Sequence, residues 1–478
     1  MRVTLTVIGG PHTGQTFSFG GHDTFLVGRS KRAHFRLPSK DRFFSRVHFL
    51  VEVNPPQCRL MDMGSRNGTY VNGQRVEETV DLKDKDQIRA GRTVLRVSVE
   101  ASDPEPVLEP EPAPGPEAAP EVEAVPVPVL EEPVPVLPLD EEEVMAVSLP
   151  DFDPAAQSFP EVETVPAICR LCDSPVTGTD EVPLPDPPAL LCRACLEQIY
   201  YQDQFIDGYH IVRAIGKGSM GVVYLAVRKQ DDIAVALKMI IPAVSGTTAQ
   251  LKRFLREAEI LQQLSHPNIV SFRDSGQSNG KIFFAMDYVR GRDASQILRS
   301  ESPLAVSRGV SLVCQLLEAL EYAHARGFVH RDIKPANLLV SPQRGREVVK
   351  LADFGLARVY QSSQLSGLTM SGDIGGTVAF MAPEQITNYR ESLPPVDQYA
   401  AAATLYNLLT GQYIYDLPRE FPKQLRLILE EDAVSIRKRR SDVPEGLATV
   451  IHRALSRAPN ERFNDVREFH TALSPFAR

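Results

Sequence analysis

Cysteine is scarce in this chain, with six among 478 residues, and so few in so long a chain do not make a disulfide scaffold. No uninterrupted apolar run is long enough to span a bilayer, so the sequence predicts no membrane-spanning helix. The longest candidate, residues 399–409, is too short and is expected to form a buried helix. The N-terminus lacks a cationic stretch followed by an apolar one, so we expect no signal peptide. These absences predict a cytoplasmic protein.

Lysine and arginine are missing from residues 97–169, which hold eighteen aspartates and glutamates. Setting these eighteen acidic residues aside changes the formal net charge from −9 to +9. The remaining chain is therefore mildly basic, which suits phosphate-bearing partners, but we expect no nucleic acid. Proline recurs among valine and glutamate from 100 to 165, which predicts an extended linker with polyproline II character. A docking strip for a basic partner is a second interpretation of this segment.

The length predicts two or three domains, and residues 1–99 are expected to form the first. Apolar residues alternate with other residues at 3–7 and 49–53, as in strands with one buried face. Asn-Gly turn signals occur at 67–68 and 72–73, and no convincing helix pattern is present. Short strands joined by regular turns predict an all-β sandwich.

The C-terminal part begins strand-rich, from 207 to about 290, with one helical insert at 249–263. Helical spacing dominates after that point, which predicts a small β-lobe followed by a larger α-lobe. Within the first strands, Gly216, Gly218 and Gly221 form a G-x-G-x-x-G pattern, where backbone N–H groups can approach phosphates closely. Dinucleotide-binding folds use the same pattern to open a helix, but here a β-branched strand follows, which favours a hairpin lid.

Lys238 ends an apolar strand seventeen residues after the glycine pattern. A lone buried lysine is costly, so it needs a carboxylate partner, and Glu257 in the helical insert is the expected one. Three further blocks follow in order: VHRDIKPAN at 329–337, LADFG at 351–355 and MAPE at 381–384.

These blocks, in this order and at these spacings, resemble a eukaryotic-type protein kinase domain of the kind also found in bacteria, over residues 207–473. The resemblance implies a bilobal α+β kinase domain at 207–478 that uses ATP and Mg²⁺ and phosphorylates protein substrates. Lys334 and a Gly-Thr pair at 376–377 resemble serine/threonine kinases, where the hydroxyl of Thr377 bridges Asp332 and Lys334.

The resemblance also implies a role for each matching residue. Asp332 would accept the substrate hydroxyl proton, and Lys334 would contact the γ-phosphate. Lys238, paired with Glu257, would contact the α- and β-phosphates. The remaining assignments are Mg²⁺ ligands (Asn337, Asp353), the phosphate cover (Gly216, Gly218, Gly221), a gatekeeper (Met286), the adenine-contacting hinge (Asp287 to Val289) and supports of the large lobe (Asp397, and Glu384 with Arg462).

Arg331 precedes the expected base, and a phosphate in the activation segment would give it a counter-charge. Thr369 and Ser371 are the candidate acceptors of that phosphate. The alternative of a catalytically inactive pseudokinase is disfavoured, because such chains usually lose the equivalent of Lys238, Asp332 or Asp353.

The N-terminal region holds four blocks, at 26–30, 44–48, 62–73 and 82–88, whose loops are expected at one end of the sandwich. Arginine forks and a serine hydroxyl are what a phosphate monoester requires. In order, the blocks resemble a forkhead-associated domain, a reader of phosphothreonine peptides. The implied phosphate contacts are Arg29, Ser45 and Arg66; Arg46 and Asn67 would contact phosphate or the peptide main chain, His48 would be a buried structural residue, and Gly28 would form the turn. Alternatively, Asn67 stabilises its own Asn-Gly turn. The arginines also have a second explanation, as charged residues that only make the rim of the sandwich soluble.

Two C-x-x-C pairs, Cys169 with Cys172 and Cys192 with Cys195, lie nineteen residues apart within 166–206. Each pair places two thiolates beside a tight turn, and together they predict a closed, structural Zn²⁺ site in a small zinc ribbon. A dithiol redox switch and plain reduced surface cysteines are the alternatives. Cys58 and Cys314 lie in apolar contexts and are expected to be core residues.

The sequence thus predicts a multidomain serine/threonine kinase with a phosphothreonine reader and a zinc ribbon. Two other functions stay open: a catalytically weak phosphopeptide-binding scaffold, and a kinase that senses redox state or metal through the cysteines. Neither the physiological substrates nor the choice between a monomer and a dimer follows from the residues.

Overall fold

The structure is a computed structural model that describes residues 1–20, 23–37, 41–100, 182–184, 189–191, 206–218, 221–240, 260–278, 281–343, 345–353, 378–388 and 393–478. Its N-terminal region consists of two β-sheets, as the alternating sequence predicts. One sheet has the strand order β2-β1-β11-β10-β7-β8 and the other the order β4-β3-β5-β6-β9. The strands are β1 Arg2–Gly9, β2 Thr16–Gly20, β3 Asp23–Gly28, β4 Phe35–Arg36, β5 Phe49–Asn54, β6 Gln57–Asp62, β7 Thr69–Val71, β8 Gln74–Arg75, β9 Val80–Asp81, β10 Gln87–Ala90 and β11 Thr93–Glu100.

The core of this region lies between the two sheets. Val3, Leu5 and Val7 of β1 are at most 1% exposed, because alternate side chains of a strand point to the same face. They share one hydrophobic cluster with Phe49 and Val51 of β5 in the other sheet. The predicted core residue Cys58 lies in the same cluster, where burial raises the pKa of its thiol to about 12.

A second sheet-rich part begins after residue 206, with the antiparallel order β14-β15-β16-β18-β17. Its strands are β14 Tyr209–Gly218, β15 Gly221–Arg228, β16 Ile233–Ile240, β17 Phe272–Ser278 and β18 Lys281–Asp287, with a 3₁₀ turn, η1, at Ile260–Gln263. A separate two-stranded ladder joins β12 (Val182–Leu184) to β13 (Ala189–Leu191).

Helices dominate the chain after residue 293, so the order of a β-lobe and then an α-lobe is confirmed. The α-helices are α3 Ala294–Glu301, α4 Val306–His324, α6 Pro383–Thr387, α7 Pro395–Thr410, α8 Phe421–Glu430, α9 Ile436–Arg439, α10 Glu445–Ala454 and α11 Val466–Leu473. Short strands β19 Arg292–Asp293, β20 Leu338–Gln343 and β21 Arg346–Leu351 form a small sheet among them, and the 3₁₀ turns are η2 Pro335–Asn337, η4 Val378–Phe380, η5 Pro459–Glu461 and η6 Ser474–Ala477.

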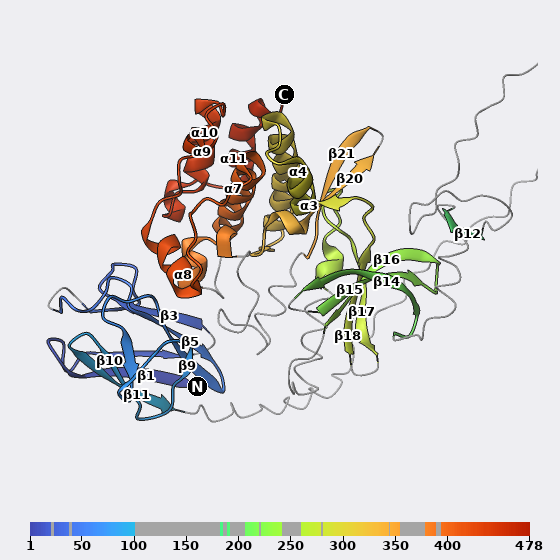
Figure 1. The fold of residues 1–478 in the computed structure, drawn as a ribbon. Helices are drawn as coiled ribbons and strands as arrows, with labels where there is room; N and C mark the ends of the chain where they lie inside the picture. The colour runs from blue at the N-terminus through green and yellow to red at the C-terminus, as the bar shows by residue number, and fades with distance from the viewer. Residues whose placement is uncertain are drawn as a thin grey trace, which may run out of the picture. The chain divides into compact units, whose positions relative to one another are not determined.

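Helix α7 is the centre of the helical lobe, and it lies beside α4 (Figure 1). Its side chains are buried on every face from Val396 to Leu409, so the predicted buried helix at 399–409 is confirmed. Gly411 ends the helix in the left-handed region, at φ +70°, and donates its N–H to the carbonyl of Asn407 at 2.8 Å. Over the described residues, no helix has the length and apolar character needed to cross a bilayer.

Candidate active site

The glycine pattern forms a β-hairpin, as the following β-branched strand predicts. Gly218 at the end of β14 pairs with Gly221 at the start of β15, and Gly216 pairs with Val223. Gly221 has φ +141°, a conformation that side chains rarely allow. At its three glycines the hairpin therefore carries no side chain that would keep a phosphate away from the backbone.

Lys238 occupies the third strand, β16, opposite Val223 and Phe284 of the flanking strands. The residue is buried, with 7% of its surface exposed, and its Nζ lies 2.8 Å from Oδ2 of Asp353. The carboxylate partner that burial demands is thus Asp353 in this structure. The predicted partner, Glu257, lies outside the described residues.

The carboxylate of Asp353 follows strand β21, and the residue has φ +58°. Burial by itself would raise the pKa of this carboxyl group, but the charge and hydrogen bond of Lys238, with a contribution from Lys334, lower the pKa below its ordinary value. Asp353 is therefore held as an anion next to a cation, the state in which a carboxylate can also bind a metal ion.

The block at 329–337 forms a loop that gathers three polar side chains. Lys334 Nζ lies 2.9 Å from Oδ2 of Asp332. Asn337, in the 3₁₀ turn η2, donates from Nδ2 to the Asp332 carbonyl at 2.7 Å and to its Oδ2 at 3.1 Å. These bonds fix the Asp332 carboxylate at a partly exposed position, with 28% of the side chain accessible.

A buried carboxylate on α7, that of Asp397, holds the backbone of the loop at 329–337. Asp397 is 0% exposed and accepts the backbone N–H groups of His330 and Arg331, both at 2.7 Å. Nε2 of His324, at the end of α4, lies 2.8 Å from the same carboxylate. Burial alone would raise the pKa of Asp397. The hydrogen bond and charge of His324, with the bond from the Arg331 N–H, outweigh burial, so the pKa lies below its ordinary value. The supporting role expected of Asp397 is visible here, whereas His324 was not predicted from the sequence.

The loop is also held from the side of α6. Gln385, 4% exposed, donates from Nε2 to the carbonyl of Arg331 at 2.7 Å. Its neighbour Glu384 accepts both terminal nitrogens of Arg462, at 2.6 and 2.8 Å, which is the predicted supporting pair. Sequence reasoning missed Gln385, because its position after the Ala-Pro-Glu element is visible but its partner, 54 residues away, is not.

The expected nucleotide hinge begins at the end of β18. Met286 pairs with Ala236 of β16 and with Phe272 of β17, so its backbone is fixed on both sides. Asp287 closes the strand and donates its N–H to the Ser271 carbonyl at 2.9 Å. Val289 lies two residues beyond the strand and is partly buried. The backbone of the expected hinge is therefore fixed by neighbouring segments up to Asp287.

The residues present fit a divalent cation held by oxygen ligands. Asp353 offers a carboxylate whose lowered pKa keeps it ionised. Because Asn337 uses its nitrogen for Asp332, it can offer Oδ1 to a cation. Carboxylate and amide oxygens are the ligands that Mg²⁺ prefers, with water and phosphate completing its shell.

The second group of predicted residues lies on loops of the N-terminal sandwich. Arg29, directly after β3, donates its backbone N–H to the Ser45 carbonyl at 3.1 Å, and its Nε donates to the Phe44 carbonyl. The backbone N–H of Arg66 donates to Oγ of Ser45 at 3.1 Å. The structure thus brings Arg29, Ser45 and Arg66 together from three separate loops, as their predicted shared ligand requires. The side chain of Arg46, next to Ser45, is 61% exposed.

Gly28 and His48 hold these loops in place. A Cβ atom on Gly28 would lie 2.1 Å from the Arg46 carbonyl oxygen, so only glycine allows this close approach. His48 is 0% exposed and accepts the Ser45 N–H at Nδ1, 2.8 Å away, which leaves the proton on Nε2 facing the Gly68 carbonyl. Burial lowers the pKa of His48, although the Gly68 carbonyl and the charges of Asp62 and Asp41 oppose it. The buried structural role predicted for His48 agrees with this geometry.

Asn67 has a partner that the sequence did not suggest. Its Nδ2 donates to the carbonyl of Phe43 at 2.8 Å, so it links two loops and does not close its own Asn-Gly turn. The sequence predicts that this amide bonds either a bound peptide or its own turn. The link to Phe43 depends on the packing of two separate loops.

Several predicted residues lie outside the described part of the chain. They are Glu257, the cysteines Cys169, Cys172, Cys192 and Cys195, the candidate phosphate acceptors Thr369 and Ser371, and Thr377. Within the residues that are described, no cluster of three or more histidine, cysteine, aspartate or glutamate side chains could hold a metal ion.

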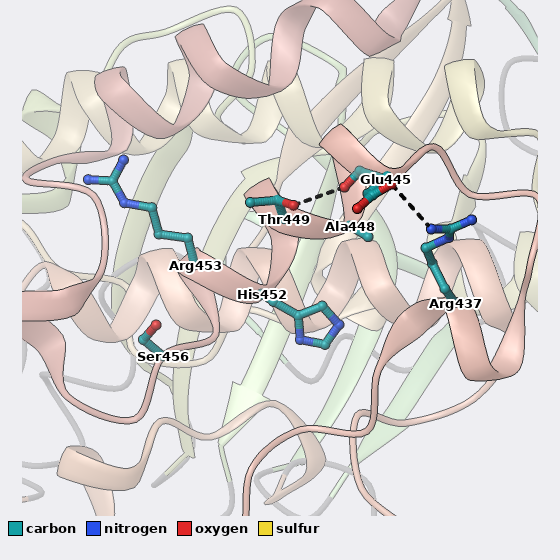
Figure 2. A pocket seen from close by; sticks show the side chains of 7 residues that line it. All are labelled: Arg437, Glu445, Ala448, Thr449, His452, Arg453 and Ser456. Atoms are coloured by element: carbon teal, nitrogen blue, oxygen red, sulfur yellow. Dashed lines mark hydrogen bonds and ion pairs between the residues drawn. The ribbon is translucent and has the colours of Figure 1, made fainter.

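A hollow elsewhere on the helical lobe lies against α9 and α10, and Figure 2 shows the residues around it. Arg437 pairs with Glu445 at 3.8 Å, and Thr449 donates to the Glu445 carbonyl at 3.0 Å. His452 accepts the N–H of Ile436 through Nε2 at 3.0 Å. The lining contains none of the predicted catalytic or phosphopeptide-binding residues.

Comparison with known families gives two matches along this chain. A family described as the protein kinase domain matches residues 209–473, and the FHA domain family matches residues 25–91. Each match contains one of the two groups of polar side chains described above.

Relatives that match include bacterial kinases. The serine/threonine-protein kinase pkn3 of Myxococcus xanthus is 35% identical over 269 residues, which is 55% of this chain and 49% of the relative. The serine/threonine-protein kinase PknF of Mycobacterium tuberculosis is 36% identical over 271 residues, 56% of each chain. The chain thus spans about half the length of these relatives. The solved kinase domain of Mycobacterium tuberculosis PknI has 31% identity and a TM-score of 0.45, and the match covers 58% of this chain and 100% of that one.

Proposed function

This chain belongs to the protein kinase domain family, and from that membership we propose that it transfers the γ-phosphate of ATP to serine and threonine hydroxyls of proteins, itself included. The observation that carries the proposal is the arrangement around Asp332, whose carboxylate is held by Asn337 and Lys334 at an accessible position. A carboxylate fixed in this way can accept the proton of an incoming hydroxyl group.

The chemical step uses few groups of this chain. Asp332 accepts the proton from the substrate hydroxyl, whose oxygen forms a new bond to the γ-phosphorus. The bond between that phosphorus and the β–γ bridging oxygen breaks, and ADP leaves with the bonding electron pair. Lys334, beside Asp332, offers an ammonium group to the transferring phosphoryl oxygens. Catalysis therefore depends mainly on positioning and on neutralising charge.

Lys238, Asp353 and Asn337 are the residues of this chain that would hold the nucleotide phosphates and Mg²⁺. When bound, Mg²⁺ neutralises charge on the phosphate oxygens. To hold the metal ion, Asp353 would either turn away from Lys238 or give one carboxylate oxygen to the metal ion and the other to Lys238. The glycine hairpin formed by β14 and β15 covers the phosphates, and the segment from Asp287 to Val289 receives the adenine.

The experiment that tests this function is phosphate transfer by the purified full chain. Wild-type protein with Mg²⁺ and γ-labelled ATP should label itself and a generic acceptor protein on serine and threonine. Asp332→Asn keeps the size of the side chain but removes the base, and we expect the rate to fall by about a hundredfold or more. Wild-type protein that transfers no label under oxidising and reducing conditions would exclude the proposed activity.

We also propose that the N-terminal region binds phosphothreonine peptides through Arg29, Ser45 and Arg66, with Arg46 and Asn67 nearby. The family match and the convergence of three loops on one patch support this role. Arg29→Ala should abolish binding of a phosphothreonine peptide, measured by fluorescence anisotropy, while ATP turnover stays unchanged. Equal affinity of the peptide for both proteins would overturn the assignment.

The four cysteines and the two hydroxyls carry further proposals. We infer that Cys169, Cys172, Cys192 and Cys195 hold one structural Zn²⁺, because four thiolates are a donor set that suits zinc. Metal analysis of protein purified without chelators should find one zinc per chain, and its absence would favour a redox role.

We infer that Thr369 and Ser371 accept phosphate, which phosphopeptide mapping tests directly. Cytoplasmic location stays a prediction of the sequence.

A further inference from the structure

The peptide that joins Arg331 to Asp332 is held at both of its polar atoms. Its carbonyl, from Arg331, accepts Nε2 of Gln385 at 2.7 Å. Its N–H, from Asp332, faces Nδ1 of His330 at 3.2 Å. This peptide sets the backbone direction from which the Asp332 side chain projects. Holding both atoms therefore fixes the direction in which the Asp332 side chain leaves the backbone.

The backbone needs this hold, because Arg331 lies in the left-handed region with φ +69°. That region is unfavourable for residues with a Cβ atom, so a non-glycine residue stays there only where its surroundings impose it. Asp397 binds the N–H of Arg331 on one side of the residue, and Gln385 binds its carbonyl on the other. The two side chains together clamp the strained residue.

Gln385 is itself well anchored. It is 4% exposed in α6, and its backbone N–H donates to the Ala382 carbonyl at 3.0 Å. Its neighbour Glu384 is joined by two hydrogen bonds to Arg462, whose side chain is fully buried. The amide of Gln385 therefore presents its N–H from a fixed support.

We propose that Gln385 is a positioning residue for phosphoryl transfer, which orients the Asp332 carboxylate through the Arg331–Asp332 peptide. The inference rests on the proposed kinase activity and adds one residue to it. The Gln385 amide bonds the Arg331 main chain and not a side chain assigned to ATP. Its loss should therefore lower kcat and leave the KM for ATP nearly unchanged.

The first test compares two buried glutamines with the same chemistry. Gln385→Met keeps the size of the side chain and removes the N–H donor. The matched control is Gln424→Met in α8, because Gln424 is 7% exposed and donates at the same distance, 2.7 Å, to the Pro418 carbonyl, which is not part of the loop at 329–337. We expect Gln385→Met to lower kcat roughly tenfold to a hundredfold, since small misplacements of reacting groups have effects of that size. Gln424→Met should keep the wild-type kcat at a similar melting temperature.

The second test uses protonation to restore the donor within one protein. In Gln385→Glu the introduced carboxyl group can donate to the Arg331 carbonyl only while it is protonated, and burial raises its pKa. Its kcat, divided by that of wild type at each pH, should fall as the pH rises from about 5 to about 8. A purely structural defect would not produce this reversible dependence.

The outcomes separate the inference from the function on which it rests. Active wild-type protein, with a kcat for Gln385→Met equal to that of Gln424→Met, would overturn the role of Gln385 alone. A kcat ratio for Gln385→Glu that does not change with pH would overturn it as well. Wild-type protein without any transfer would instead exclude the proposed kinase activity.

Discussion

The Nζ atom of Lys238 lies 2.8 Å from Oδ2 of Asp353, although 115 positions separate the two residues in the chain. Lys238 belongs to the five-stranded sheet, and Asp353 follows strand β21. Lys238 thereby gains the partner that its burial demands, and the Asp353 carboxylate is held as an anion beside it. The pair also brings together the cation and the anion that the proposed reaction needs around the phosphates.

Lys238→Met should abolish phosphate transfer, because it removes the ammonium group while keeping the side-chain length. The control is Lys350→Met, since Lys350 donates to the Pro267 carbonyl at 2.9 Å and has no assigned role in the reaction. We expect a fall in rate of about a hundredfold or more for Lys238→Met and an unchanged rate for Lys350→Met. Labelled-ATP assays of the three proteins measure this, and equal rates would contradict the role of Lys238.

The same variant makes a prediction about acid stability. The pKa of Asp353 lies below its ordinary value of 3.8 in the folded protein, so the ion pair stabilises the fold above that pH. This stabilisation is lost as the pH falls through the folded pKa. The gap in melting temperature between wild type and Lys238→Met should therefore narrow from about pH 7 to about pH 3. A constant gap over this range would show that Asp353 does not titrate against Lys238.

Glu384→Gln should destabilise the helical lobe. The Arg462 side chain is 0% exposed, and the variant removes the negative charge that compensates it. Breaking one side of a buried ion pair costs about 3–5 kcal/mol, and the low end applies because Glu384 is 25% exposed. Urea unfolding measures the change. Glu321→Gln, which breaks an exposed pair with Arg467, should leave the midpoint unchanged; equal effects of the two variants would contradict the argument.

Gly28→Ala should abolish phosphothreonine-peptide binding, because the new Cβ atom would lie 2.1 Å from the Arg46 carbonyl oxygen and push two loops apart. Gly9→Ala is the matched control on β1, where the nearest atom to a new Cβ is 3.5 Å away, an ordinary contact. Peptide titration by fluorescence anisotropy compares the two variants with wild type. If Gly28→Ala binds as tightly as Gly9→Ala does, the close approach is not needed for the site.

The N-terminal sandwich should lose stability as the pH falls below about 6.5, the ordinary value for histidine. Burial lowers the pKa of His48 below that value, so the unfolded chain takes up a proton that the folded chain resists. His48→Asn can still accept the Ser45 N–H but does not titrate, and its melting temperature should depend less on pH from about 5 to about 8. The pKa of His34 is also lowered. The variant His34→Asn therefore measures how much of the dependence of melting temperature on pH comes from His34. An unchanged slope in His48→Asn would refute the role of His48.

Much of the fold could be predicted from local patterns. Alternation at residues 3–7 and 49–53 indicates strands with a buried face, and apolar character on every side of residues 399–409 indicates a buried helix. These predictions succeed because the side-chain period of a strand or helix is a property of neighbouring residues. The hairpin at the glycine pattern is of the same kind, since the β-branched strand that follows lies next to it in the chain.

The sequence by itself determined which chemical groups the protein carries: a carboxylate at Asp332, an ammonium group at Lys238, and arginines with a serine in the N-terminal loops. Only the tertiary structure decided their partners, including Asp353 for Lys238, Phe43 for Asn67 and Gln385 for the Arg331 carbonyl. A hydrogen bond or ion pair between distant segments forms where packing brings two buried polar groups within about 3 Å, and that distance is set by the whole core. The motif residues can be identified from short stretches of sequence, whereas the bonds that orient them depend on the fold.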